Sequence, residues 1–130
     1  MTDGYILIVE DDENSRMLAR DVLQATGYRT AEAETAEEGL RLIRETPPDL
    51  ILMDIHLPGM SGFEALRHLR SDPATHAIPV MAVTASAMTH DRPRVLAAGF
   101  DGYQTKPISV RELLEAVRGL LEPPRPPDTP

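Results

Sequence analysis

The chain has 130 residues, of which 42% are hydrophobic and 4% aromatic, and its formal net charge is −8. This size and composition predict one compact domain and exclude a disordered or fibrous protein. The absence of cysteine excludes disulfides, thiolate metal sites and a cysteine nucleophile. The acidic balance argues against direct nucleic-acid binding, and no apolar run approaches the roughly 20 residues that span a bilayer. The first residues also lack the basic start of a secretory signal. We therefore expect a cytoplasmic protein that does not bind a membrane.

Apolar runs typical of strands alternate with helical patterns along the chain. This alternation predicts an α/β fold with a parallel sheet and helices on both faces. The predicted strands are residues 5–9, 28–33, 50–53, 79–83 and 102–105, and the predicted helices are 13–26, 36–46, 62–71, 88–98 and 110–121.

Local capping signals support several of these boundaries. The Ser/Thr-x-x-Glu capping box, in which side chains satisfy free backbone donors, occurs three times: Thr35 with Glu38, Ser61 with Glu64, and Ser109 with Glu112. Gly27 and Gly99 follow helical stretches where a left-handed cap is expected. Pro93 disfavours the interior of a helix, so the helix predicted over 88–98 should begin near Asp91 or Arg92, or have a distorted first turn.

We divide the chain into one domain over residues 1–121 and a tail over 122–130. The tail contains five prolines and no apolar face, so it cannot extend the last helix or join the core. We expect it to be flexible or to be the start of a linker.

Polar side chains follow several of the predicted strands. Glu10 and Asp11 follow the first strand, Asp54 the third, Thr84 the fourth and Lys106 the fifth. In an open parallel sheet, ligands bind beyond the carboxyl ends of the strands, so these side chains are expected to converge. Individually each residue has a common structural explanation; their joint occurrence at four strand ends indicates a phosphoryl-transfer site.

Crowded carboxylates resist ionisation unless a cation lies among them. Oxygen ligands without thiols suit Mg²⁺ better than Zn²⁺. In such a site Asp54 would attack phosphorus as a nucleophile, while Lys106 and the metal neutralise charge and the Thr84 hydroxyl donates a hydrogen bond.

These residues and their surroundings resemble the receiver domains of two-component response regulators over residues 5–121. The resemblance rests on the combination of four motifs: Ile8-Val9-Glu10-Asp11-Asp12, residues 53–62, Val83-Thr84-Ala85, and residues 99–108. It implies a flavodoxin-like fold of five parallel strands in the order 2-1-3-4-5 with five helices.

The resemblance also implies residue roles. Asp54 matches the phosphoacceptor, and Glu10, Asp11, Asp54 and the backbone carbonyl of His56 match the magnesium ligands. Thr84 and Lys106 match the pair that contacts the phosphoryl group, the bond from Lys106 to Pro107 is cis in the family, and Ala85 matches a small residue beside the pocket. Asp12 falls outside the acidic pair and is interpreted as a helix cap.

Signalling roles follow from the same resemblance. Tyr103 matches the aromatic switch that follows Thr84, and the predicted output face consists of 88–98, 102–105 and 110–121. The implied partners are a sensor histidine kinase or histidine phosphotransfer protein and an unidentified downstream protein, with this chain acting as a stand-alone monomer or weak dimer. The domain would catalyse only its own phosphorylation and dephosphorylation.

The histidines have separate interpretations. His56 lies two residues after Asp54, where its side chain borders the pocket entrance and is expected to influence attack by water. His68, His76 and His90 are interpreted as surface or loop residues without the spacing of a second metal site.

Two alternatives remain open on the sequence. A haloacid-dehalogenase-like phosphatase also uses an aspartate nucleophile and Mg²⁺, but its second aspartate would occupy the position of His56. A degenerate receiver would keep the fold and signal without phosphate, although here every reactive position is occupied.

Overall fold

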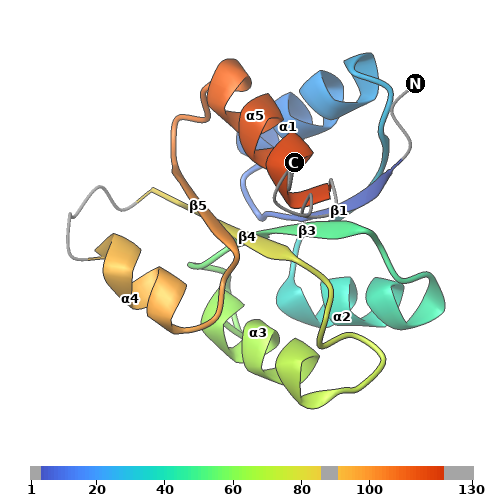
Figure 1. Cartoon of the computed structure of the whole chain (residues 1–130), viewed down its shortest axis with the longest axis vertical. Helices are drawn as coiled ribbons and strands as arrows, with labels where there is room; N and C mark the ends of the chain where they lie inside the picture. Colours follow the sequence, from blue (N-terminus) through green and yellow to red (C-terminus); the bar gives the residue numbers. More distant parts are fainter. Residues whose placement is uncertain (1–3, 86–90, 122–130) are drawn as a thin grey trace, which may run out of the picture.

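The computed structural model describes residues 4–85 and 91–121. In chain order the elements are β1 (Tyr5–Val9), α1 (Glu13–Ala25), β2 (Arg29–Ala33), α2 (Ala36–Glu45), β3 (Leu50–Asp54), α3 (Gly62–Ser71), β4 (Val80–Thr84), α4 (Asp91–Ala97), β5 (Gly102–Thr105) and α5 (Val110–Leu121). The strands form one parallel sheet in the order β2-β1-β3-β4-β5, as the resemblance implied (Figure 1). The flavodoxin-like fold is confirmed.

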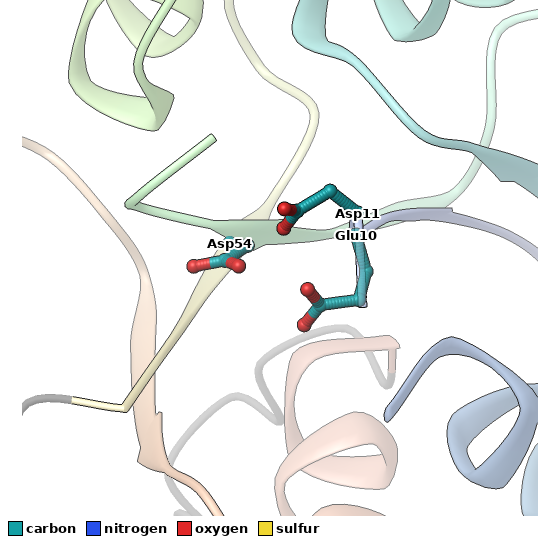
Figure 2. Close-up of side chains that lie close together, drawn as sticks. All are labelled: Glu10, Asp11 and Asp54. Carbon is teal, nitrogen blue, oxygen red and sulfur yellow. The ribbon is translucent and has the colours of Figure 1, made fainter. Parts of the chain in front are cut away.

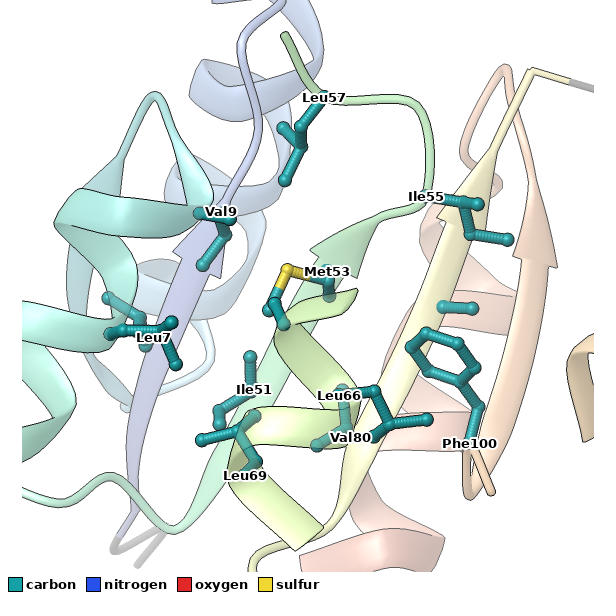
Figure 3. Close-up of a cluster of buried hydrophobic side chains, with 14 of the residues drawn as sticks. Leu7, Val9, Ile51, Met53, Ile55, Leu57, Leu66, Leu69, Val80 and Phe100 are labelled. Carbon is teal, nitrogen blue, oxygen red and sulfur yellow. The ribbon is translucent and has the colours of Figure 1, made fainter. Parts of the chain in front are cut away.

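The sheet separates two apolar layers because alternate residues of each strand face opposite sides. On β1, Leu7 and Val9 belong to the apolar layer between the sheet and α2, α3 and α4, whereas Ile6 and Ile8 belong to the layer between the sheet and α1 and α5. Figure 3 shows the first layer, in which Leu66 and Leu69 of α3 lie against the sheet. Every residue of β3 and β4 is buried, as expected for central parallel strands.

The predicted caps are confirmed. The hydroxyl oxygens of Thr35, Ser61 and Ser109 each accept a hydrogen bond from the backbone N–H three residues later, at 3.1, 3.2 and 3.3 Å. Gly27 and Gly99 have φ angles of 105° and 111°, which L side chains rarely adopt.

The observed element ends differ from the predicted ones by one residue at several places. β3 extends to Asp54 and β4 to Thr84, because both residues still pair in the sheet, with Val83 and Thr105 respectively. Tyr28 is not in β2, since its N–H bonds to Leu23 at the end of α1.

The structure describes α4 over Asp91–Ala97, which contains Pro93. The late start expected for this helix stays a prediction, because the residues before Asp91 lie outside the described part of the chain. The preceding positions of the predicted helix, including His90, and the tail at 122–130 lie outside the described residues. Among the residues that the structure describes, no helix is long and apolar enough to cross a membrane.

Candidate functional site

The candidate site lies at the carboxyl ends of β1 and β3. These strands are neighbours, yet the chain leaves β1 for α1 on one face of the sheet and β3 for α3 on the other (Figure 1). Such a divergence is where open α/β sheets bind ligands. The fold therefore brings Glu10 and Asp54 together, although they are far apart in the sequence.

Glu10, Asp11 and Asp54 form a compact group of carboxylates. Each offers an oxygen within 4.8 Å of the others. Figure 2 shows the three carboxylates turned toward a common space, with Asp54 reaching it from β3 and the other two from the end of β1. Glu10 and Asp54 are both 4% exposed, whereas Asp11 is exposed to solvent. The predicted convergence of these acids is confirmed.

Lys106 joins the acids from the end of β5. Its Nζ lies 2.6 Å from Oε1 of Glu10 and 3.2 Å from Oδ2 of Asp54. The other oxygen of Asp54, Oδ1, accepts a hydrogen bond of 3.0 Å from the backbone N–H of His56. Both oxygens of the Asp54 carboxylate thus have donors that set its orientation. The peptide bond between Lys106 and Pro107 is cis, as the resemblance implied.

Ionisation of the clustered acids is disfavoured despite Lys106. Burial, together with a hydrogen bond to Asp54, raises the pKa of Glu10 from 4.5 to about 7, although Lys106 opposes the shift. Burial lowers the pKa of Lys106, but its hydrogen bond to Glu10 and the charge of Asp54 outweigh this, so the net pKa is raised. One ammonium therefore does not fully compensate the buried acids.

The donor set fits Mg²⁺. Three carboxylates within reach of one another, one of them open to solvent, offer oxygen ligands and leave room for water, as Mg²⁺ requires. Within residues 4–85 and 91–121 this is the one group of acidic or histidine side chains close enough to hold a metal ion. Neither His68 nor His76 belongs to it, and both are exposed, as expected.

Asp12 caps α1, as predicted. Its Oδ2 accepts a 2.9 Å hydrogen bond from the backbone N–H of Ser15, which lowers the pKa of Asp12. Its own N–H donates to Oε2 of Glu10 at 3.0 Å. Asp12 therefore shapes the turn and is not one of the three clustered acids.

Thr84 and Tyr103 lie on the side of the site nearer α4. Thr84 is 1% exposed, and its carbonyl accepts a 2.8 Å hydrogen bond from the backbone N–H of Lys106. Thr84 and His56 line a cavity of about 230 Å³ with residues of α3 and α4. Tyr103 is half-buried against the core, with the Arg92 guanidinium 6.0 Å from its ring centroid. Ala85, which follows Thr84, and His56 are both exposed.

Arg16 of α1 is a residue of the site that the sequence interpretation missed. Its side chain is only 13% exposed, and it donates a 3.0 Å hydrogen bond to the backbone carbonyl of Glu10. A signal existed: Arg16 precedes the buried Ala19 and Leu23 by three and seven residues, so it occupies the apolar stripe of an amphipathic helix.

Comparison with known proteins decides the family. Residues 6–118 match the model of the response regulator receiver domain. This chain belongs to the receiver domain family. Receivers are the regulatory modules of two-component systems rather than dedicated enzymes. The match assigns the chain to receivers and not to the dehalogenase-like phosphatases.

Individual receivers are similar over nearly their whole length. The polar-differentiation response regulator DivK of Brucella ovis is 45% identical over 116 residues, covering 89% of this chain and 94% of the relative. A putative response regulator from Chloroflexus aurantiacus is 30% identical with a TM-score of 0.88, covering 92% and 98% of the two chains. The receiver domain of the sensor histidine kinase PA1611 from Pseudomonas aeruginosa, solved with a magnesium ion in its active-site cleft, has 30% identity, a TM-score of 0.84 and the same coverage.

Proposed function

We propose that this receiver accepts a phosphoryl group on Asp54 from a phosphohistidine of a sensor kinase or phosphotransfer protein, in a reaction that requires Mg²⁺. The observation that supports this most directly is the contact of Lys106 with both Asp54 and Glu10. A carboxylate nucleophile, acids for a metal and a fixed ammonium are the groups that phosphoryl transfer to aspartate needs.

Each residue has a separate role in the transfer. A carboxylate oxygen of Asp54 attacks phosphorus, the P–O bond forms as the P–N bond to the imidazole breaks, and the bonding electron pair returns to the histidine nitrogen. The backbone N–H of His56 and the ammonium of Lys106 hold the Asp54 carboxylate in place. Lys106 then neutralises a phosphoryl oxygen, and the Thr84 hydroxyl donates a hydrogen bond to another.

Glu10, Asp11, Asp54 and the backbone carbonyl of His56 are the groups that would hold Mg²⁺. The bound ion would supply positive charge against the phosphoryl oxygens and relieve repulsion among the acids. The magnesium-bound PA1611 receiver supports this assignment by analogy.

We further propose that phosphorylation is transmitted through α4, β5 and α5 to a partner protein, with Thr84 and Tyr103 as the switch. Tyr103 connects the core to Arg92 of α4, so a change in its position would alter that helix. Leu96 of α4 and Val110 of α5 are 42% and 45% exposed, which offers apolar contact area for a partner.

Intact-mass analysis with acetyl phosphate and Mg²⁺ tests the phosphorylation. We expect one added phosphoryl group on the wild type, none in the presence of EDTA, and none on Asp54→Asn. A label that persists on Asp54→Asn would refute Asp54 as the acceptor. An unlabelled wild type that also shows no amide shifts with the phosphate mimic beryllofluoride would favour the degenerate receiver instead.

A further inference from the structure

Arg16 joins the Asp54 site to β2. Its Nη1 donates to the backbone carbonyl of Glu10 at 3.0 Å, and its Nε forms an ion pair of 3.2 Å with Oε1 of Glu32 on β2. A weaker contact of 4.0 Å reaches Glu34. The Arg16 side chain is 13% exposed, and its guanidinium bonds to both Glu10 and Glu32. It is therefore a rigid link, because its planar donors have fixed directions.

The target of this link is the backbone at Glu10. The N–H of Glu10 donates to the carbonyl of Ala33 at the end of β2, at 2.9 Å, and its carbonyl accepts from Arg16. Both backbone polar groups of Glu10 are therefore bonded. The orientation of this residue sets where its carboxylate meets Lys106, and the next residue, Asp11, is the exposed acid of the cluster.

We propose that Arg16 is a positioning residue for the metal-binding acids: it holds the turn between β1 and α1 so that Glu10 and Asp11 face Asp54 before a cation arrives. This inference rests on the proposed Mg²⁺-dependent function. Partners that orient metal ligands from outside the coordination shell typically change metal affinity by about 10–100-fold when removed.

Arg16 also has a charge, whose effect must be separated from its positioning effect. A cation near the acids opposes Mg²⁺ binding, whereas the Glu32 carboxylate beside it favours binding. Removing Arg16 alone would leave Glu32 without this partner, so it would change the local charge as well as the positioning of Glu10. Removing the two together keeps the net charge constant and isolates the loss of positioning.

The test compares two charge-balanced double variants. Arg16→Met with Glu32→Gln removes the link to Glu10. Arg20→Met with Asp21→Asn is the matched control, since Arg20 lies one turn later on α1 and pairs with Asp21 at 3.0 Å. Arg16 keeps its bonds to the Glu10 carbonyl and to Glu32 in this control.

The primary readout is Mg²⁺ affinity from amide chemical shifts, measured where each protein is folded. We expect the Arg16 double variant to bind Mg²⁺ about tenfold more weakly and the Arg20 double variant to stay within about twofold of the wild type. Without metal, hydrogen exchange at the Asp12 amide should be faster only in the Arg16 double variant. At saturating Mg²⁺, labelling of Asp54 should recover toward the wild-type rate. Arg16→Lys, which keeps the charge, should have a Mg²⁺ affinity between those of the two double variants.

The outcomes separate this inference from the proposed function. Equal Mg²⁺ affinities for the two double variants would overturn the positioning role, whatever their melting temperatures. A wild type that binds Mg²⁺ but never labels Asp54 would contradict the proposed function and leave the affinity comparison valid. A wild type that does not bind Mg²⁺ would overturn both.

Discussion

Among the described residues, Glu10 is the one whose pKa the fold shifts most. Its pKa of about 7 in the folded protein lies above the value of 4.5 for a free side chain, so the folded state binds this proton more tightly. The resulting stabilisation is fully present below pH 4.5 and is lost as the pH rises through 7. In the absence of Mg²⁺, Glu10 therefore destabilises the protein at alkaline pH.

Replacing Glu10 by Gln tests this. Without metal at pH 8, we expect Glu10→Gln to raise the free energy of unfolding by up to roughly 3 kcal/mol, because the amide removes the cost of the ionised form. Urea unfolding in EDTA at pH 4 and pH 8 measures it, and the gain should disappear at pH 4. A variant less stable than the wild type at pH 8 would show that the ion pair with Lys106 dominates.

At the scale of elements, α3 begins unusually close to β3. A Cβ atom on Gly62 would lie 2.6 Å from the carbonyl oxygen of Asp54 and 2.9 Å from the Cα of Ile55. Both are backbone atoms, and Gly62 also donates a 2.9 Å hydrogen bond to the Ile55 carbonyl. Only glycine permits this approach, which sets the loop beside the Asp54 site.

Gly62→Ala should therefore destabilise the protein by at least 1–3 kcal/mol, roughly the usual cost of overpacking. Gly119 in α5 is the control, because a Cβ atom added there would meet no atom of another described element within 4 Å. Gly119→Ala should be neutral or stabilising by up to about 1 kcal/mol, owing to the better helix propensity of alanine. Chemical denaturation of both variants measures the difference, and similar losses for the two would contradict the steric explanation.

Arg70 of α3 joins the segment before β4 to the segment before β5, at the end of the sheet away from Asp54. It donates to the carbonyls of His76, Ile78 and Gly99 and forms an ion pair of 2.8 Å with Asp101. Asp101 in turn accepts a 2.8 Å hydrogen bond from the N–H of Val80. These bonds anchor the start of β4 and the end of the loop after α4.

Arg70→Met should lower the free energy of unfolding by about 1–3 kcal/mol, because it leaves several carbonyls and the Asp101 carboxylate without their charged donor. Arg67→Met is the matched control on the same helix, since the Arg67 side chain is exposed and has no hydrogen bond or ion pair within the described part of the chain. Thermal unfolding of both variants measures the contrast. Equal melting temperatures would show that the Arg70 contacts contribute nothing net.

At the scale of the whole molecule, the net charge of −8 adds to the attraction of the acidic cluster for cations. A ligand that binds only the folded state stabilises it, by about 2.7 kcal/mol at one hundred times its dissociation constant. Mg²⁺ should therefore raise the melting temperature, and NaCl should weaken the effect by screening.

Asp11→Asn and Glu13→Gln separate the cluster from the overall charge. Each removes one negative charge from an exposed acid near the start of α1, but only Asp11 belongs to the cluster. Mg²⁺ should stabilise Glu13→Gln nearly as much as the wild type and Asp11→Asn much less. Equal responses in a calorimetric or fluorescence melt would mean that the ion acts through general electrostatics.

The amino-acid sequence by itself determined the elements, the caps and the group of residues at the strand ends. These depend on local chemistry: the periodicity of apolar residues, hydroxyls three residues before a glutamate, and polar residues directly after apolar runs. The strand order came from family resemblance, since periodicity does not say which strands are neighbours. The end of β3 at Asp54 was missed because it depends on pairing with Val83, which is distant in the sequence. Tyr28 was wrongly placed in β2 because its N–H bonds to Leu23 at the end of α1.

Tertiary structure alone decided which groups touch. That Lys106 meets both acids, that Arg16 holds the carbonyl of Glu10, and that Gly62 lies against the backbone of β3 are contacts between separate elements. The raised pKa of Glu10 likewise arises from burial and from neighbours distant in the chain. Distances and desolvation are properties of the packed molecule, so no pattern along the chain could have specified them.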